Sequence, residues 1–346
     1  MGQSNGSGTW SGTFATQNEL FLKVFAGEVL QTFETEAVMK PLHMIRTITS
    51  GKSAQFPVTG IASAKYHKPG TDILVDNGHD SASYVTAFKH VEKVINVDDL
   101  LIATTFIDKL DEAKNHYDVR SIYSQELGRA LAKKFDKNLI GLAILTAATF
   151  SGSAPTARAE NVTSSGAGTL LTDADYNGAG GNIPVAAIDD FVSQMYDMAA
   201  AFDTKNVPTE DRYCVVTPTT YYRLVNSADG RLLINRDYGG TGNYSAANLM
   251  SVAGFKIVRS NNAASVFGQS LSAATGSNNT YTANFTRVVA SCFQKAAFGT
   301  VKLMDLAMES EYDMRLQGHT MLAKYAMGHG ILRPECAGII TGTADS

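Results

Sequence analysis

The most regular pattern of apolar residues lies over residues 118–150, a stretch without proline. At about 3.6 residues per turn, five large apolar side chains of this stretch fall on one face of a helix. They are Leu127, Leu131, Phe135, Leu142 and Leu145. Ile122 and Ile140 break the pattern, so we expect them to contact a second surface. The sequence therefore predicts a long helix over 118–150 that docks its apolar face on the rest of the protein.

Basic residues follow the opposite side of this predicted helix at intervals of four. They are Arg129, Lys133 and Lys137. Such a face is either solvated or in contact with an acidic partner, and the pattern itself leaves both interpretations open.

Residues 46–66 and 84–98 have the β-branched residues and partial alternation of extended strands. The turn signals Pro69-Gly70 and Asn77-Gly78 lie between them. The sequence thus predicts a β-hairpin whose arms are longer than the usual strand of about 5–6 residues. A two-stranded ribbon is barely stable alone in water, so we expect this hairpin to lie on a neighbouring copy of the chain.

Six hairpin residues are expected to form that contact. Apolar contact should come from Phe88, Val91 and Ile95, and ion pairs from Lys89, Glu92 and Lys93. An exposed ion pair contributes only about 0–1 kcal/mol, so apolar burial should dominate the contact.

Shorter predicted helices and strands fill the remainder of the chain. Helices are expected at 19–35, 186–202 and 218–225, and strands at 212–217, 254–259 and 285–293. Residues 299–328 should form further strands. Because glycine favours turns, we expect turns at Gln317-Gly318 and at Gly328-His329-Gly330.

The composition narrows the class of protein. Charged residues make up 18% of the chain and hydrophobic residues 44%, which excludes global disorder and suggests that partner subunits cover some of the surface. A formal net charge of −4 argues against a protein whose main task is to grip nucleic acid. The first charged residue is Glu19, so the chain has no basic region of a signal peptide, and its longest apolar stretch is too short for a membrane span.

Candidate catalytic and metal-binding patterns are weak. Ser50-Gly51-Lys52-Ser53 resembles the end of a phosphate-binding loop, but Arg46 stands where that motif requires glycine. The three cysteines, Cys214, Cys292 and Cys336, are far apart and lack CxxC spacing, which argues against a disulfide framework or a zinc site.

An acidic patch of Asp98, Asp99, Asp108, Asp111 and Glu112 is expected to be a solvated face. The 7 histidines have no spacing typical of zinc ligands, and His116 and His329 should be structural hydrogen-bonding residues. We therefore expect no metal, no cofactor and no catalytic site.

Six segments closely resemble the major capsid proteins of T-seven-like short-tailed bacteriophages, the autographiviruses. They are FLKVFAGEVL (21–30), HMIRTITSGKSAQFPVTG (43–60), HVEKVINVDDLL (90–101), NHYDVRS (115–121), GTVKLMDLA (299–307) and AKYAMGHGILRPECAG (323–338). These segments span most of the chain. Residues 67–83, 151–182, 226–250 and 262–284 have no obvious counterpart.

The resemblance implies an α+β fold, the HK97-like phage capsid fold. Its expected parts are an N-terminal arm (1–45), a long β-hairpin called the E-loop (46–98), a P-domain with a long spine helix (99–159), an A-domain (160–285) and C-terminal P-domain strands (286–346). It also implies that the loop at 226–248, with Arg231 and Arg236, lines the centre of a capsomer. Arg129, Lys133 and Lys137 would then be inner-face contacts for scaffold or DNA.

The function implied is that of a major capsid protein of a podovirus. It would self-assemble in the host bacterial cytoplasm into hexamers and pentamers of a T=7 icosahedral shell, which encloses double-stranded DNA in the virion. The implied partners are other copies of the chain, a scaffolding protein, a portal protein and DNA held by weak non-specific contact, with a decoration protein as a further candidate and no membrane. The alternative is an encapsulin-like compartment shell of the same fold, which would hold protein cargo.

Overall fold

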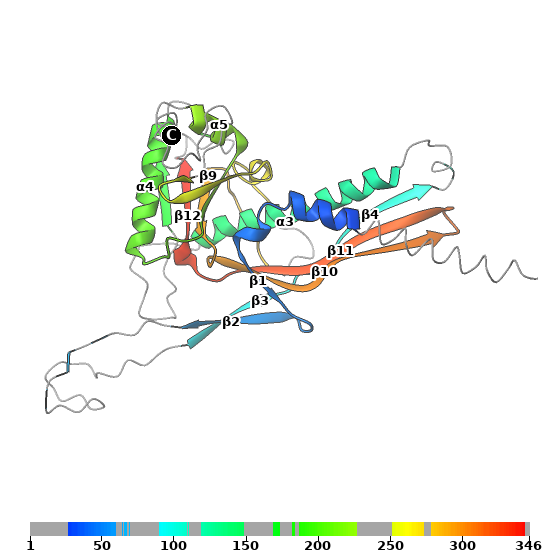
Figure 1. Cartoon of the computed structure of the whole chain (residues 1–346), viewed down its shortest axis with the longest axis horizontal. Coiled ribbons are helices and arrows are strands. Elements are labelled where there is room, and N and C mark those ends of the chain that lie inside the picture. The colour runs from blue at the N-terminus through cyan, green and yellow to red at the C-terminus, as the bar shows by residue number, and fades with distance from the viewer. Residues whose placement is uncertain are drawn as a thin grey trace, which may run out of the picture.

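Two β-sheets, a long helix that joins them and a projecting hairpin make up the frame of the subunit (Figure 1). The computed structural model describes residues 27–59, 90–108, 119–148, 169–173, 187–226, 251–272 and 278–342, together with 64, 66–67, 69, 110 and 182–183. No helix of this described part is long and apolar enough to cross a membrane.

The first sheet has four strands in the order β1-β10-β11-β4. They are β1 (Met44–Thr47), β10 (Phe298–Asp313), β11 (Gly318–Ile331) and β4 (Leu101–Asp108). β1 runs parallel to β10, and the other two pairs are antiparallel. β10 and β11 form a long hairpin that turns before Gly318, where Gln317 has a left-handed φ of 54°. The predicted turn at Gln317-Gly318 is thereby confirmed.

The second sheet has six strands in the order β5-β12-β9-β6-β8-β7. They are β5 (Thr169–Asp173), β12 (Ala337–Gly342), β9 (Val288–Gln294), β6 (Arg212–Val216), β8 (Phe255–Arg259) and β7 (Ser251–Val252). The helices α4 (Ile188–Thr204) and α5 (Pro218–Asn226) lie in the same part of the molecule (Figure 1). A Cβ at Gly338 of β12 would lie 2.8 Å from Met198 Cε, so α4 packs directly against this sheet.

The helix α3 (Val119–Ala148) contacts strands of both sheets. Leu131, Phe135 and Leu142 of its predicted apolar face are each 2% exposed. Ile140 is fully buried, because the second half of α3 packs against β9 and β12 as well as the four-stranded sheet. Ile122, in contrast, is 58% exposed, so it contacts no second surface within the described subunit.

A short helix over residues 27–36 packs along the first half of α3. Val29 and Phe33 are buried, as the predicted helix requires, whereas Leu22 and Phe25 lie outside the described residues. A Cβ at Gly128 of α3 would lie 2.9 Å from the Val29 carbonyl oxygen, so glycine allows the two helices to approach closely. The 3-10 turn η1 (Lys40–Leu42) then leads into β1.

The predicted hairpin is confirmed at its base. β2 (Ser53–Thr59) pairs antiparallel with β3 (His90–Asn96), and Ala54 lies opposite Ile95. In Figure 1 this pair runs below the four-stranded sheet and away from it. The turn signal Asn77-Gly78 lies outside the described residues.

Two predictions about the C-terminal third need correction. Of the range 286–346, only β10 and β11 belong to the four-stranded sheet, because β9 and β12 return to the six-stranded one. A single limit at 285/286 therefore does not separate the two sheets. The second correction concerns Gly328-His329-Gly330, which does not form a turn but lies inside β11. Glycine is needed there because the β2–β3 hairpin packs against this part of the strand and leaves no room for a Cβ.

Candidate assembly interface

A small apolar core anchors the hairpin on its own subunit. Ala54, Ile95 and Val97 at the hairpin base pack with three residues of the sheet region, which are Val301, Ala326 and Leu332. Ile95 is only 1% exposed. It is therefore not available to a neighbouring subunit, which corrects its predicted role as an intersubunit contact. The physical reason is that β3 turns the face that carries Ile95 toward β11.

Two glycines of β11 allow this close approach. A Cβ at Gly328 would overlap the Asn96 carbonyl oxygen and would lie 2.8 Å from Val97 Cα. A Cβ at Gly330 would lie 2.6 Å from Ile95 Cγ1. The hairpin backbone thus rests directly on β11.

The other face of the hairpin points to solvent. Val94 is 53% exposed, and Glu92 on the same face is also exposed. Lys93 lies on the inward face opposite Phe56 and is half-buried. Within the described residues neither Glu92 nor Lys93 forms an ion pair.

Three further hairpin residues, Phe88, Lys89 and Val91, are predicted to contact the neighbouring subunit. Phe88 and Lys89 lie outside the described residues, and Val91 is placed in β3 only by its pairing with Val58. Their intersubunit roles stay predictions.

Asp98 fixes the point where the hairpin returns to the sheet. Its carboxylate accepts hydrogen bonds from the backbone N–H groups of Asn278 (2.8 Å) and Asn279 (3.1 Å) and from the Tyr281 hydroxyl. Burial raises the pKa of Asp98, although these hydrogen bonds act in the opposite direction. Asp98 is therefore a half-buried structural junction, and its predicted place on a solvated acidic face is wrong.

A chain of buried polar groups continues from this junction into the subunit. The His329 backbone N–H donates to the Tyr281 hydroxyl at 3.0 Å, and the His329 ring is 2.8 Å from Thr300 Oγ1. Thr300 Oγ1 is 2.6 Å from His43 Nε2, and His43 Nδ1 is 2.8 Å from the Met39 carbonyl oxygen. Burial lowers the pKa of His43 to about 4 and that of His329 to about 3, so both rings are neutral near pH 7. The predicted structural role of His329 is confirmed.

Asp136 of α3 continues the same chain. Its carboxylate accepts the backbone N–H groups of Val38 and Met39, each at 3.1 Å, and the Asn262 side-chain amide at 2.9 Å. Asn262 immediately precedes the 3-10 turn η5 (Ala263–Ser265) of the part with the six-stranded sheet. Burial raises the pKa of Asp136. The polar chain therefore ties the N-terminal segment, the long helix, both sheet regions and the hairpin base together.

One face of the four-stranded sheet is only partly covered by the hairpin. The hairpin covers this face at Gly328 and Gly330, and the face is open at the other end of β11. On β11 the residues Gly328 and Gly330 face the hairpin, and Leu322 and Lys324 share their face because alternate residues of a strand point the same way. On β4, Ile102 lies opposite Lys324, Thr104 opposite Leu322 and Phe106 opposite Thr320. Ile102 is 54% exposed and Phe106 44%. The alternation in LIATTFID indicates this open apolar face in the sequence.

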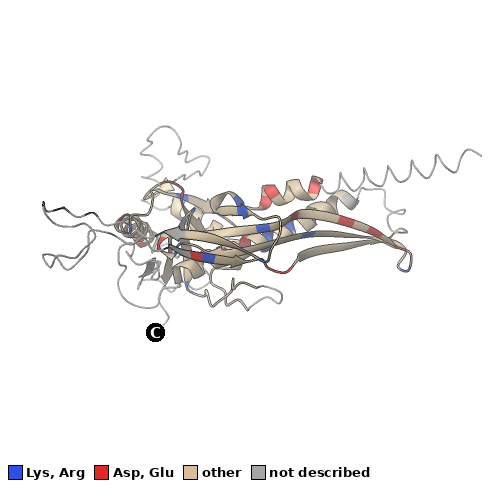
Figure 2. Ribbon diagram, turned by 90° about the horizontal axis from the view of Figure 1, so that it is seen from below, with Lys and Arg blue, Asp and Glu red and all other residues tan. Residues whose placement is uncertain are grey.

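Acidic residues flank this open face. Glu309 and Glu311 of β10 lie opposite Leu322 and Thr320, and Figure 2 shows acidic residues, in red, along the outer parts of these long strands. Glu309 forms an ion pair with Lys324. Glu311 is exposed and has no ion pair within the described part of the chain.

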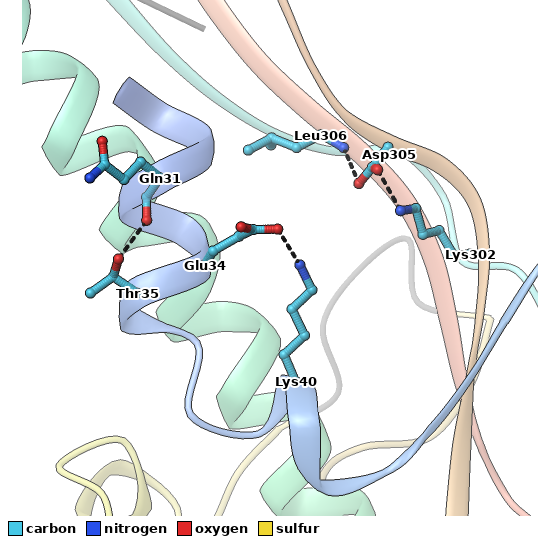
Figure 3. A network of polar contacts seen from close by, with 7 residues as sticks. All are labelled: Gln31, Glu34, Thr35, Lys40, Lys302, Asp305 and Leu306. Atoms are coloured by element: carbon cyan, nitrogen blue, oxygen red, sulfur yellow. Dashed lines mark hydrogen bonds and ion pairs between the residues drawn. The ribbon is translucent and has the colours of Figure 1, made fainter. Parts of the chain in front are cut away.

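A second polar cluster lies where the N-terminal segment passes the irregular stretch of β10 (Figure 3). Lys40 Nζ is 2.9 Å from Glu34 Oε1, and Asp305 accepts both Lys302 and the Leu306 backbone N–H. Burial would raise the pKa of Asp305, but the hydrogen bond and charge of Lys302 hold it below its usual value. These pairs are largely exposed, so each contributes about 0–1 kcal/mol.

The predicted basic stripe of α3 is only partly free. Arg129 forms ion pairs with Glu126 (2.7 Å) and with Glu36 (3.6 Å) of the preceding helix. Lys133 is exposed and Lys137 half-buried, and neither has an acidic partner in the part of the chain that the structure describes. Partial burial and the charge of Lys137 lower the pKa of Lys134. Arg231 and Arg236 lie outside the described residues.

The described residues contain no group of three or more His, Cys, Asp or Glu side chains that could hold a metal ion. One polar groove of about 260 Å³ lies between the 27–36 helix and α3, and it is lined by residues that include Glu28, Glu36 and Arg129.

The two sheets, the joining helix and the projecting hairpin define the class of protein, a phage capsid subunit with the HK97-like fold. The solved capsid of the cyanophage P-SCSP1u is similar, with a TM-score of 0.69 and 41% sequence identity over 88% of this chain and 87% of that one. The major capsid proteins of Enterobacteria phage T3 and Escherichia phage T7 are each 35% identical over 98% of this chain, and the matches cover 96% and 97% of those proteins.

Residues 55–341 match the model of the Gp10A-like major capsid proteins. The chain belongs to this family, whose members are structural proteins rather than enzymes. It is a shell protein of a tailed phage and a component of the virion, and it self-assembles with other copies of itself.

Proposed function

We propose that this chain forms the hexamers and pentamers of a T=7 icosahedral head, assembled in the host bacterial cytoplasm around a scaffold and later filled with double-stranded DNA. The observation that carries the proposal is that the hairpin covers only part of one face of the four-stranded sheet, which we call the outer sheet face. Its own hairpin covers the end at Gly328 and Gly330, while the end with Ile102 and Phe106 stays open.

The open end has the properties of a surface that a second hairpin covers. Ile102, Phe106 and Leu322 supply apolar contact, and Glu309 and Glu311 add negative charge along one side. The hairpin arm supplies Val94 as an exposed apolar residue and Lys89 as complementary charge. Lys93 lies on the inward face, so its long side chain would have to reach around the edge of the arm to add a second positive charge. We therefore place the hairpin of one subunit on the outer sheet face of its neighbour.

Most of the contact energy should be apolar. Covering the exposed parts of Ile102, Phe106 and Val94 should contribute on the order of 1 kcal/mol each at about 25 cal/mol per Å². A pair such as Lys93 with Glu311 at the rim would add about 0–1 kcal/mol and would mainly fix the register of the two subunits.

Lys133 and Lys137 are the candidates for contact with an acidic scaffold segment or with DNA. Arg129 already has two carboxylate partners, so its contribution should be smaller. The net charge of −4 keeps any DNA contact weak, which suits a genome that must slide during packaging. The loop with Arg231 and Arg236 is proposed to line the capsomer centre, the portal to replace one pentamer, and a decoration protein to bind outside.

The relatives favour a phage head over an encapsulin-like compartment. Both 35%-identical relatives reported above are phage major capsid proteins, and the match extends over 98% of this chain. Purified particles should accordingly contain DNA after infection rather than a protein cargo.

A double-mutant cycle tests the hairpin contact. Val94→Ser and Phe106→Ser should each lower the yield of shells assembled with scaffold, as counted by negative-stain electron microscopy. If the two side chains serve one interface, the double variant should lose clearly less than the sum of the two single losses. Ile122→Ser, at a similarly exposed apolar residue of α3, is the matched control and should assemble normally. Strictly additive losses, or normal assembly of both single variants, would contradict the proposed contact.

A further inference from the structure

Two of the three cysteines face each other in the six-stranded sheet. In the antiparallel pair of β6 and β9, Cys214 lies directly opposite Cys292. The two residues are 78 positions apart in the sequence, and only the strand register brings them together. Both side chains are fully buried.

The hydrogen-bond pattern shows which kind of cross-strand pair this is. The Lys295 backbone N–H donates to the Asp211 carbonyl oxygen at 3.2 Å, so these two residues form a hydrogen-bonded pair. Hydrogen-bonded and non-hydrogen-bonded pairs alternate along an antiparallel ladder. Cys214 and Cys292 lie three positions farther along, which makes them a non-hydrogen-bonded pair.

This type of pair is the one that brings side chains closest. Its Cα atoms are about 4.5 Å apart, within the range of about 4.4–6.8 Å that disulfides span. Both side chains lie on the same face of the sheet, because directly opposite residues of a ladder share a face. The adjacent Cys214 thiol and burial raise the pKa of Cys292, so the Cys292 thiol is protonated and unreactive until the sheet opens locally.

We propose that Cys214 and Cys292 form a reversible oxidation site within each subunit, which a two-electron oxidant such as hydrogen peroxide converts to a cross-strand disulfide. One thiol attacks the peroxide as a thiolate, the O–O bond breaks, and a sulfenic acid and one water form. The second sulfur then displaces the sulfenic oxygen as a second water. Two thiols and one peroxide thus give one S–S bond and two waters.

The site would respond to the surroundings of the particle. Thiols persist in a reducing cytoplasm and are lost outside it, so the bond should form slowly in particles that have left the cell. It would join two neighbouring strands in the middle of the sheet and close a loop that includes α5, β7 and β8. The link lies inside one subunit and leaves neighbouring subunits unconnected. This inference does not depend on the proposed hairpin contact.

Thiol counting on wild-type particles tests the proposal without any substitution. Native particles are incubated with hydrogen peroxide and then denatured in the presence of an alkylating reagent that blocks free thiols. The cysteine peptides are then mapped by mass spectrometry. We expect the Cys214 and Cys292 peptides to be linked, Cys336 to be alkylated, and a non-reducing gel to show monomer only. Dithiothreitol should restore all three thiols, and oxidation should raise the unfolding midpoint of the subunit.

Substitutions identify the partners. Cys336→Ala particles should form the Cys214–Cys292 disulfide as wild type does. In Cys214→Ala particles Cys292 should remain a thiol, and in Cys292→Ala particles Cys214 should remain a thiol. Alkylation of all three cysteines in wild-type particles, under conditions that fully oxidise glutathione in the same tube, would overturn the proposal. A disulfide that involves Cys336 or a second subunit would overturn it as well.

Discussion

Replacement of Gly328 by alanine is the sharpest single test of how the hairpin is held. The new Cβ would overlap the Asn96 carbonyl oxygen and would lie 2.8 Å from both the Asn96 carbonyl carbon and Val97 Cα. An ordinary carbon contact begins at 3.4 Å, so relief of the 2.8 Å contacts alone requires the hairpin base to move by about 0.6 Å, and relief of the overlap with the carbonyl oxygen requires more. All these atoms belong to the backbone, so no side-chain rotation can relieve the contact.

The movement should disturb two sets of interactions. Ile95 would withdraw from its small core, and the hydrogen bond from the Asn279 side chain to the Asn96 carbonyl oxygen (2.8 Å) would lengthen. Overpacking of a well-packed site costs about 1–3 kcal/mol, and a weakened hydrogen bond adds about 1 kcal/mol. We expect Gly328→Ala to lower the free energy of unfolding of the unassembled subunit by about 2–4 kcal/mol.

Two measurements check this expectation. Urea unfolding gives the free energy, and hydrogen exchange should show faster exchange of the amides in residues 90–98. Gly27→Ala is the matched control, because a Cβ there has nothing within 4 Å. Unchanged urea midpoint and unchanged amide protection in Gly328→Ala would refute the close-approach explanation.

Three further predictions follow from other parts of the subunit. Ile95→Ala should lower the free energy of unfolding by about 2–5 kcal/mol, whereas Val94→Ala should leave it within about 0.5 kcal/mol, and urea unfolding compares the two; equal losses would mean that the two faces of β3 are assigned wrongly. The pKa values of His43 and His329, lowered to about 4 and 3, imply that the unfolded chain binds more protons below pH 6.5. Stability should thus be full above pH 6.5 and fall as the pH drops toward 4, by up to about 3 kcal/mol for His43 alone. The raised pKa values of Asp98 and Asp136 oppose this trend, so the decisive comparison is with His43→Gln, whose pH dependence should be shallower; parallel curves would speak against the histidine. Finally, Lys133→Gln combined with Lys137→Gln should weaken scaffold-dependent assembly or DNA retention, and this effect should diminish with added salt, while Arg129→Gln should change less; wild-type values at every salt concentration would identify the stripe as solvated surface.

Local patterns along the chain predicted the main elements because those elements bury one regular face. The spacing of Leu131 and Phe135 revealed α3, and RYCVVT revealed a strand that proved to be in the middle of a sheet. The resemblance to capsid proteins gave the fold class and the function.

The errors arise where a residue serves a distant part of the chain. Gly328 and Gly330 resemble turn glycines, but they are required by the hairpin that crosses them from more than 200 residues away. Asp98 resembles a member of a solvated acidic run, yet it caps the segment at Asn278 and Asn279. Strand register likewise decides that Ile95 points inward and that Cys214 meets Cys292.

A reconstruction of the assembled shell by electron cryomicroscopy tests the central claim most directly. We expect hexamers and pentamers in which the hairpin of each subunit lies on the outer sheet face of a neighbour. In such a map Ile102 and Phe106 should be covered by residues of the neighbour's hairpin, and Val94 should lie in the intersubunit contact. A map in which this sheet face is open to solvent, with the hairpin seated on another part of the neighbour, would contradict the account.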